Sequence, residues 1–310
     1  MLTLRQRARQ FSTLVKRSVT QQRAGQIHRP VLAGKSELGI TFIGHSGFFL
    51  QMGGKNILID PNFARWLFLL KRLRNPGVRI RELPAVDYVL VTHAHFDHLH
   101  RPSLRRVANV TRRLTGQTPT LVVPKHVTDV VRSLGFTNVV ELGWWDECHD
   151  ANGGLTITHV PAKHWGARMI RDHHRGFGGY VLRDGRHSVY HAGDTAYFKG
   201  FEEIGKRLKP EIALLPIGAY HPESYRNVHT SPEDALQGFL DLRARWMIPM
   251  HYGSFRLSHE PMEEPTQRLR AAAKLAGVSD RVMVLEEGVT KVFESGKSRT
   301  TGDTPVPRGQ

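Results

Sequence analysis

Histidine and aspartate are concentrated in one short stretch of this chain. Residues 87–100 read DYVLVTHAHFDHLH, in which an apolar run is followed directly by His93, His95, Asp97 and His98. Neutral imidazoles and carboxylates are the natural protein ligands of zinc, iron and manganese. In an extended segment His93 and His95 point to one side and suit one ion, whereas Asp97 and His98 follow as the chain turns and suit a neighbouring ion. The spacing therefore predicts a metal site just beyond a buried strand.

Three further apolar runs each carry a potential ligand just beyond their ends. LTITHVPA is followed by His164, SVYHAG by Asp194, and WMIPM by His251. The ends of strands in α/β folds open outward and commonly carry functional loops. One catalytic zinc uses three protein ligands and an open position, so seven residues of this kind favour two ions. Spacing alone leaves open the alternative that these three residues are solvated surface groups.

The elements that must position these residues alternate between strands and helices. Residues 38–60 read as two strands joined at Gly53 and Gly54, and later apolar runs predict strands near residues 87–91, 120–123, 139, 155–159, 179–182, 188–190, 212–216, 246–250, 282–285 and 290–293. Helices are predicted from residue 103 and over residues 125–134, 200–208 and 265–275, with another that begins at Ser231-Pro232. No repeat and no linker divides residues 38–295, which indicates one α/β domain.

The composition is that of a globular protein with a strong positive charge. Of 310 residues, 40% are hydrophobic and 23% charged, and 44 Lys and Arg exceed 28 Asp and Glu, for a formal net charge of +16. A field of that sign favours anionic partners such as nucleic acid, anionic lipid surfaces or phosphorylated substrates. The single cysteine, Cys148, excludes an internal disulfide and a cysteine-based zinc site.

The two ends of the chain differ from this domain. Residues 1–37 form a basic extension whose apolar residues are spaced as one face of a helix: Leu4, Ala8, Phe11 and Val15. Three interpretations stay open: a partly disordered extension, an amphipathic helix on an anionic membrane, and an organelle transit peptide. The chain has no run of eighteen apolar residues, so no transmembrane helix is predicted. Residues 296–310 are polar and rich in Gly, Pro, Ser and Thr, so we expect a disordered tail.

The histidine-rich stretch resembles the signature of a known enzyme family. THAHFDHLH carries the H-x-H-x-D-H motif of the metallo-β-lactamase superfamily. Further segments resemble, in order, N-acyl-phosphatidylethanolamine-hydrolysing phospholipase D and its bacterial relatives: ITFIGHSGFFLQMGGKNILIDPNF, RELPAVDYVLVTHAHFDHL, VPAKHWGAR, HAGDTAYF, LLPIGAYHPESYRNVHTSPEDA and IPMHYGSF. The resemblance covers residues 38–270, and its motifs are more specific for fold and metal than for substrate.

The resemblance implies a fold and a set of ligands. The fold is a four-layer αββα sandwich with two metal ions at one edge, zinc first, with iron or manganese as alternatives. Carried over by position, His93, His95 and His164 resemble the ligands of one ion. Asp97, His98 and His251 resemble the ligands of the other ion, and Asp194 resembles the carboxylate that bridges the two.

The resemblance also points to residues around the ions. Asp60 is expected to hydrogen-bond a ligand imidazole, with a plain turn aspartate as the alternative. His229 could donate to a substrate oxyanion or protonate a leaving group, or it is a surface residue at a helix entry. His45 occupies a family position but is equally well explained as structural. Tyr252 directly follows a ligand and could border the site.

Residues 63–81 read as an apolar and then basic loop. They include Trp66 and Phe68, which could contact an acyl chain or belong to the buried core. The residue after DHL is His100, where the phospholipase usually has an acid, so the support around the ligands is expected to differ.

These features together predict a dinuclear metal-dependent hydrolase of phospholipase D type. A metal-bridging hydroxide would attack a phosphodiester in a phospholipid-like substrate, with Asp97 or Asp194 accepting the water proton. A lactonase or another small-molecule ester hydrolase of the same fold is the alternative. Nucleic-acid binding or cleavage is disfavoured, because no metal ligand is missing and no inserted domain would clamp a strand. We expect a cytoplasmic protein, peripheral on an anionic membrane, and the sequence does not indicate an oligomeric state.

Overall fold

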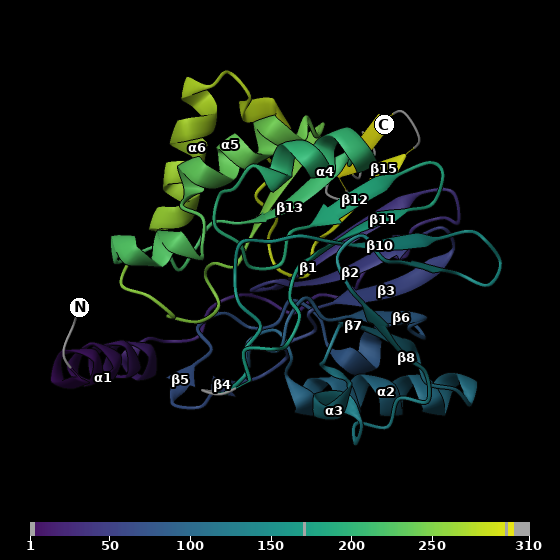
Figure 1. Cartoon of the computed structure of the whole chain (residues 1–310), viewed down its shortest axis with the longest axis horizontal. Helices are drawn as coiled ribbons and strands as arrows, with labels where there is room; N and C mark the ends of the chain where they lie inside the picture. The colour runs from purple at the N-terminus through teal and green to yellow at the C-terminus, as the bar shows by residue number, and fades with distance from the viewer. Residues whose placement is uncertain (1–3, 170–171, 295–296, 301–310) are drawn as a thin grey trace, which may run out of the picture.

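Two β-sheets pack face to face in the computed structural model of this chain, which describes residues 4–169, 172–294 and 297–300. Helices cover the outer face of each sheet (Figure 1). This is the four-layer αββα sandwich that the family resemblance implied, and the residues between the two sheets form the largest hydrophobic core.

The first sheet has eight strands, in the order β16 (Lys297–Thr300), β15 (Thr290–Glu294), β1 (Leu38–Gly44), β2 (Gly47–Met52), β3 (Lys55–Ile59), β6 (Tyr88–Leu90), β7 (Thr120–Pro124) and β8 (Val139–Leu142). Pairing is antiparallel from β16 to β3 and parallel from β3 to β8. The second sheet has six strands, in the order β14 (Trp246–Met250), β13 (Ile212–Pro216), β12 (Ser188–His191), β11 (Gly179–Arg183), β10 (Thr156–Val160) and β9 (Glu147–His149). A separate hairpin consists of β4 (Trp66–Leu67) and β5 (Leu70–Lys71).

Six α-helices surround the sheets in the described part of the chain: α1 (Leu4–Thr20), α2 (Arg101–Thr115), α3 (Thr128–Val131), α4 (Gly200–Leu208), α5 (Pro232–Leu242) and α6 (Glu264–Leu275). Three short 3-10 helices are η1 (Ile80–Glu82), η2 (Glu223–Asn227) and η3 (Ser279–Arg281). Helices α2 and α3 lie on the first sheet, and α4, α5 and α6 lie on the second (Figure 1). None of the described helices is long and apolar enough to cross a membrane.

Two predicted elements are shorter than their sequence pattern suggested. The helix predicted over residues 125–134 is reduced to the four residues of α3. The strand predicted over residues 282–285 is an irregular segment that meets β14 only through an isolated bridge between Met247 and Val282. In contrast, the cap predicted at the start of α5 is present, since Ser231 and Asp234 form a capping box.

The first predicted hairpin contains three strands rather than two. Gly44 and His45 adopt positive φ angles of 114° and 62°, and the β1–β2 register shifts at this point. Positive φ is uncommon for a residue with a side chain, so this turn imposes an unfavourable backbone conformation on His45. The apolar residues on both sides of the turn conceal it from pattern reading, because β1 and β2 are buried along their whole length.

The two chain ends are partly ordered. Within the basic extension, α1 packs on the β4–β5 hairpin through Leu14 and Ser18, and the N–H of Lys71 donates to Ser18 Oγ at 3.3 Å. At the other end, the segment that we expected to be disordered begins with β16, which pairs with β15. Residues 301–310, to which the same expectation applied, lie outside the described residues.

Candidate metal centre

The potential ligands lie on loops that follow four strands drawn from both sheets. They follow β6 (His93, His95, Asp97, His98), β10 (His164), β12 (Asp194) and β14 (His251). Backbone hydrogen bonds join two of these loops, those after β6 and β14, to segments of the opposite sheet. The N–H of Gly178 donates to the carbonyl of Thr92 at 3.1 Å, and the N–H of His251 donates to the carbonyl of His45 at 2.8 Å. Residues far apart in sequence therefore meet at one edge of the fold.

One group of potential ligands consists of His93, His95, His164 and Asp194. One ligand atom from each lies within 4.8 Å of the others. His95 Nδ1 is 2.8 Å from His93 Nε2 and 3.3 Å from His164 Nε2. Ring nitrogens that face one another so closely must share a proton or bind a common cation, because two lone pairs would repel.

A second group consists of His45, Asp97, His98 and His251, again with ligand atoms within 4.8 Å of one another. Asp97 Oδ2 is 3.7 Å from His98 Nε2 and 3.6 Å from His251 Nε2. The structure thus brings together the three residues that the sequence assigned to the second ion. It adds His45, whose Nε2 lies 3.0 Å from the same Asp97 oxygen.

The Asp194 carboxylate lies between the two groups. Its Oδ2 atom is 3.9 Å from both His93 Nε2 and His164 Nε2 on one side. On the other side the same oxygen is 3.3 Å from His98 Nε2 and 3.1 Å from His251 Nε2. One oxygen therefore faces imidazoles of both groups, which is the position that a bridging carboxylate requires.

The residues present fit metal ions better than they fit one another. Asp194 Oδ1, His98 Nε2 and His251 Nε2 are buried and have no aligned hydrogen-bond partner among the described residues. Buried polar atoms normally have a partner, so these three indicate a ligand. Imidazole nitrogens and carboxylate oxygens suit zinc, iron or manganese, and the oxygen-rich sites that magnesium and calcium prefer are absent from these two groups.

The electrostatics of the two groups differ. Burial lowers the pKa of His93 and His164 well below the usual range, so both rings are neutral and offer lone pairs. Burial acts in the same direction on His251, but the carboxylates of Asp194 and Asp97 outweigh it and raise the pKa of His251 to about 9. Since a metal ligand must be deprotonated, a cation at the second group would displace a proton from this ring.

Asp60 lies against a ligand imidazole. Its Oδ2 atom is 2.7 Å from His98 Nδ1, and Thr92 donates its N–H to Oδ1 and its hydroxyl to Oδ2, at 2.8 Å and 2.7 Å. These bonds direct His98 Nε2 toward Asp194. His164 is oriented in the same manner, because its Nδ1 lies 2.9 Å from the carbonyl of Val228. His100, in contrast, caps α2 through Ser103 and does not enter the centre.

His45 is a site residue that the sequence left undecided. It occupies the turn between β1 and β2, where its positive φ aims the ring at Asp97. His251 also has a positive φ, of 59°, and its ring packs against that of His45 in a tilted arrangement, with ring centroids 4.4 Å apart. Such backbone conformations persist where the surrounding structure holds them, often at functional sites. The sequence signal was a histidine between two buried strands, in GHSG.

His229 lies beside the two groups, and the partial exposure that its side chain shares with Asp97 marks the open side of the centre. Its Nδ1 is 3.8 Å from Asp194 Oδ2, and its ring stacks on His251 with centroids 5.4 Å apart. Burial lowers the pKa of His229 to about 4, so the ring is neutral at physiological pH. The side chain keeps 12% exposure, which leaves an edge available to a substrate.

Aromatic side chains form a rim beside the ligands. The Trp165 ring lies 4.7 Å from that of His95 and 4.3 Å from that of His164, and it is 37% exposed. Phe96 contacts Phe68 of the hairpin, with centroids 4.5 Å apart. Sequence reasoning missed Phe96, although it stands between two ligands in the motif.

Arg168 is a second residue that sequence reasoning missed. Its guanidinium lies 3.8 Å from the Phe96 ring centroid and donates to the carbonyls of Ala94 and Leu99. These contacts hold the ligand loop at both ends. No signal in the sequence could reveal the role, because it depends on two carbonyls about seventy positions earlier in the chain.

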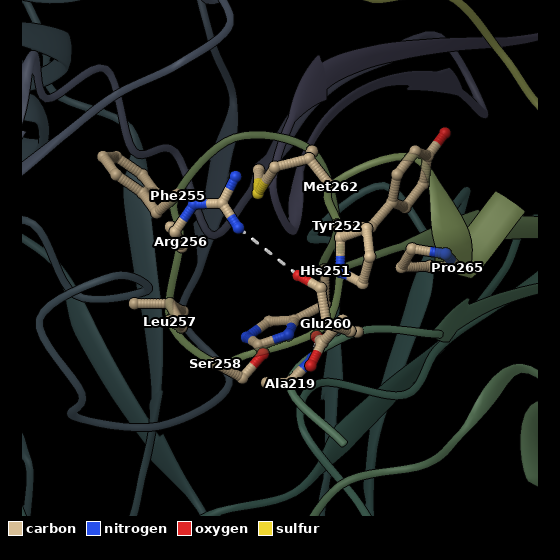
Figure 2. Close-up of a pocket in the computed structure, with 13 residues that line it drawn as sticks. Ala219, His251, Tyr252, Phe255, Arg256, Leu257, Ser258, Glu260, Met262 and Pro265 are labelled. Carbon is tan, nitrogen blue, oxygen red and sulfur yellow. Dashed lines mark hydrogen bonds between the residues drawn. The ribbon is translucent and has the colours of Figure 1, made fainter. Parts of the chain in front are cut away.

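The three residues assigned to substrate contact have different positions. Phe68 is 70% exposed beside Phe96, and Trp66 is 47% exposed on the same hairpin. Tyr252 lies elsewhere: its ring stacks on Phe42 with centroids 5.9 Å apart, and its hydroxyl is directed away from the His251 imidazole (Figure 2). Tyr252 and His251 both line the pocket drawn in Figure 2, so Tyr252 borders the candidate metal centre on the side of that pocket.

Comparison with known proteins supports a hydrolase of one family. The model of a family described as "Beta-lactamase superfamily domain" matches residues 55–252. The UPF0173 metal-dependent hydrolase MK1542 of Methanopyrus kandleri is 32% identical over 254 residues, covering 80% of this chain and 97% of that protein. The structure of Igni18, a metallo hydrolase from Ignicoccus hospitalis, superposes with a TM-score of 0.62 at 27% identity, covering 83% of this chain and 99% of that chain.

A further relative has a named substrate. The mitochondrial N-acyl-phosphatidylethanolamine-hydrolyzing phospholipase D of Saccharomyces cerevisiae is 34% identical over 268 residues, which cover 82% of this chain. The chain spans only 56% of the length of the yeast protein.

Proposed function

We propose a specific activity for this chain, which belongs to the beta-lactamase superfamily and is a metal-dependent hydrolase of that fold. The proposal is that it is a dinuclear phosphodiesterase acting on a phospholipid-like substrate. The observation that carries the proposal is the position of Asp194, whose Oδ2 atom faces imidazoles of two adjacent ligand groups. A single-ion site would need only one of the groups.

The residues divide between two ions. His93, His95 and His164 would hold one of them, and Asp97, His98 and His251 would hold the other, with Asp194 shared. Two bound ions would lower the pKa of a water molecule and take up negative charge from the reacting ester. His45 would fix Asp97 through the contact between its Nε2 and Asp97 Oδ2.

The side chains around the ions would move protons and orient the ester. Asp97 or Asp194 would accept the proton that the attacking water loses, since both carboxylates are held in the ionised form. Burial alone would raise the pKa of both carboxyl groups, but nearby imidazoles keep each pKa well below its usual range. His251 and His98 act in this way on Asp194, and His98 acts on Asp97. His229, neutral and partly exposed, would donate an N–H to a phosphoryl oxygen or to the leaving oxygen.

The rim supports a substrate with apolar chains. Trp165 contacts the rings of His95 and His164, and Phe96, which follows His95 in the motif, contacts Phe68 of the exposed hairpin; we call these three aromatic side chains the aromatic path. An acyl chain laid along this path would bury apolar surface, which favours a phospholipid-like ester over a small polar one. The substrate named for the yeast relative belongs to the same class.

A substrate panel tests the proposal. Metal-loaded protein would be assayed on N-acylated phosphatidylethanolamine, phosphatidylcholine, a soluble bis-aryl phosphodiester and an acyl-homoserine lactone. We expect release of phosphatidic acid from the N-acylated lipid, with phosphodiester turnover that exceeds lactone turnover. Asp194→Ala should abolish hydrolysis, whereas the matched exposed change Asp280→Ala should leave it unaltered. Lactone turnover without phosphodiester turnover would refute the proposal in favour of a lactonase.

A further inference from the structure

A pocket of about 360 Å³ lies outside the candidate metal centre, between the segment after α1, the start of the β4–β5 hairpin, the η1 region and α2. Five arginines from these four segments line it: Arg23, Arg65, Arg79, Arg81 and Arg106. No acidic residue is among its lining residues. Guanidinium groups that converge from separate segments form a surface suited to a phosphate, because each group presents a planar fork of donors to its oxygens.

The positive charge of the pocket is largely uncompensated. Arg79 pairs with Glu82 at 3.0 Å, but in the part of the chain that the structure describes no carboxylate lies within 4.0 Å of Arg65, Arg81 or Arg106. Burial and, to a lesser extent, the like charge of neighbouring Arg65 lower the pKa of Arg23. A bound anion would relieve this repulsion.

Three other basic residues of the 63–81 loop already have partners and are not available for an anion. Lys71 Nζ donates to the carbonyl of Gln21 at 2.8 Å, and Arg74 forms two bonds to Glu287. Arg72 is completely buried, and its Nη1 donates a hydrogen bond to the carbonyl of Asn62. Arg65, Arg81 and Arg106 of the pocket, in contrast, have no carboxylate partner among the described residues.

The pocket adjoins an exposed apolar hairpin. Arg65 directly precedes β4, and Trp66, Phe68 and Leu69 are 47%, 70% and 59% exposed. Helix α1 packs on β5, and α1, the hairpin and α2 lie along the same side of the molecule (Figure 1). Helix α2 adds exposed Arg101 and Arg105 and contains no acid. Positive charge and exposed apolar side chains therefore share one side of the fold.

We infer that the arginine pocket binds the phosphate head group of an anionic bilayer and, together with the apolar hairpin, docks this side of the protein on the membrane. The inference rests on the proposed function, because docking in this orientation would bring lipid to the aromatic path. Phe68 of the hairpin contacts Phe96, which stands between His95 and Asp97 in the motif. A bilayer fits better than a nucleic acid, because exposed leucine and aromatic side chains gain free energy in an acyl interior and gain little along a phosphate backbone.

Vesicle flotation tests the inference. The whole protein would be mixed with vesicles of phosphatidylcholine alone or with one third phosphatidylglycerol, at low and high salt. Neither lipid is N-acylated, so binding is read without turnover. We expect binding only to the anionic vesicles, weakening with salt. Each basic residue near such a surface contributes about fivefold to partitioning, so R65Q/R81Q/R106Q should raise the lipid concentration for half-binding about 100-fold.

A matched variant separates the pocket from net charge. R186Q/K199Q/K274Q removes the same charge from exposed positions outside the pocket, and it should shift half-binding by less than about fivefold. Equal losses in the two variants would overturn the inference, as would binding of inorganic phosphate by a protein that does not bind the anionic vesicles, or tighter binding to single-stranded RNA than to vesicles. Thermal unfolding and metal content, unchanged in both variants, verify folding. A protein that binds vesicles through the pocket but hydrolyses no phosphodiester would refute the proposed function alone.

Discussion

Asp60 Oδ2 lies 2.7 Å from His98 Nδ1 and connects the end of β3 to an imidazole of the candidate metal centre. The same carboxylate accepts two hydrogen bonds from Thr92, so it is fully committed. Asp60 itself has a positive φ of 44°, and the N–H of Asp60 donates to the carbonyl of Leu90 in the neighbouring strand. The orientation of His98 is thus determined by a residue at the end of a strand as well as by its own loop.

Asp60→Asn should weaken metal binding while preserving the fold. The amide NH2 group would face either the Thr92 N–H or the His98 ring, and one of these donors would lose its acceptor. We expect metal affinity to fall about 10- to 100-fold, measured by competition with a chelator. Asp87→Asn is the matched control, because that carboxylate also accepts a backbone N–H but lies at the opposite end of β6. An unchanged affinity in Asp60→Asn would show that the contact does not orient a ligand.

Metal content tests the two-ion arrangement directly. We expect about two zinc or iron ions per chain after loosely bound metal is removed, because imidazoles outnumber carboxylates in both groups. Elemental analysis of protein expressed with abundant metal gives the ratio. A ratio near one would leave one of the two groups as a hydrogen-bonded cluster, and a ratio near zero would contradict both.

His229→Gln should separate catalysis from metal binding. The ring lies beside Asp194 on the open side and, in our proposal, touches the substrate rather than an ion. We expect kcat to fall about 100-fold, the range typical of a lost proton donor, with metal content unchanged. Loss of one ion from this variant would instead make His229 a ligand, which its grouping with Asp194 and His251 also allows geometrically.

Phe68→Ser should affect lipid and soluble substrates differently. Phe68 is the exposed end of the aromatic path, so its loss removes apolar contact only for a substrate with acyl chains. We expect KM for an N-acylated phospholipid in vesicles to rise about tenfold while kcat/KM for a soluble phosphodiester stays within about twofold. The exposed Leu275→Ser on α6 provides a matched apolar control. Equal effects on both substrates would show that the hairpin supports the fold and does not contact lipid.

Much of the fold was predictable because its strands and helices have strong local patterns. Helices α4 and α5 begin where the sequence places them, at Gly200 and Pro232, and the buried strand β13 is a continuous apolar run. The same patterns failed where a turn interrupts buried residues. The break between β1 and β2 at His45 has apolar residues on both sides, so nothing in the local hydrophobicity indicated three strands.

The sequence by itself determined the residue types that could bind metal, since His93, His95, Asp97 and His98 share one loop and the remaining ligands each follow an apolar run. Only the tertiary structure decided which groups meet. The position of Asp194 Oδ2 among five imidazoles, the contact of His45 with Asp97 and the burial of Arg72 all depend on loops from two packed sheets. Local periodicity reports which face of an element is buried, but the partner across a sandwich is set by long-range packing, which no short window of sequence contains.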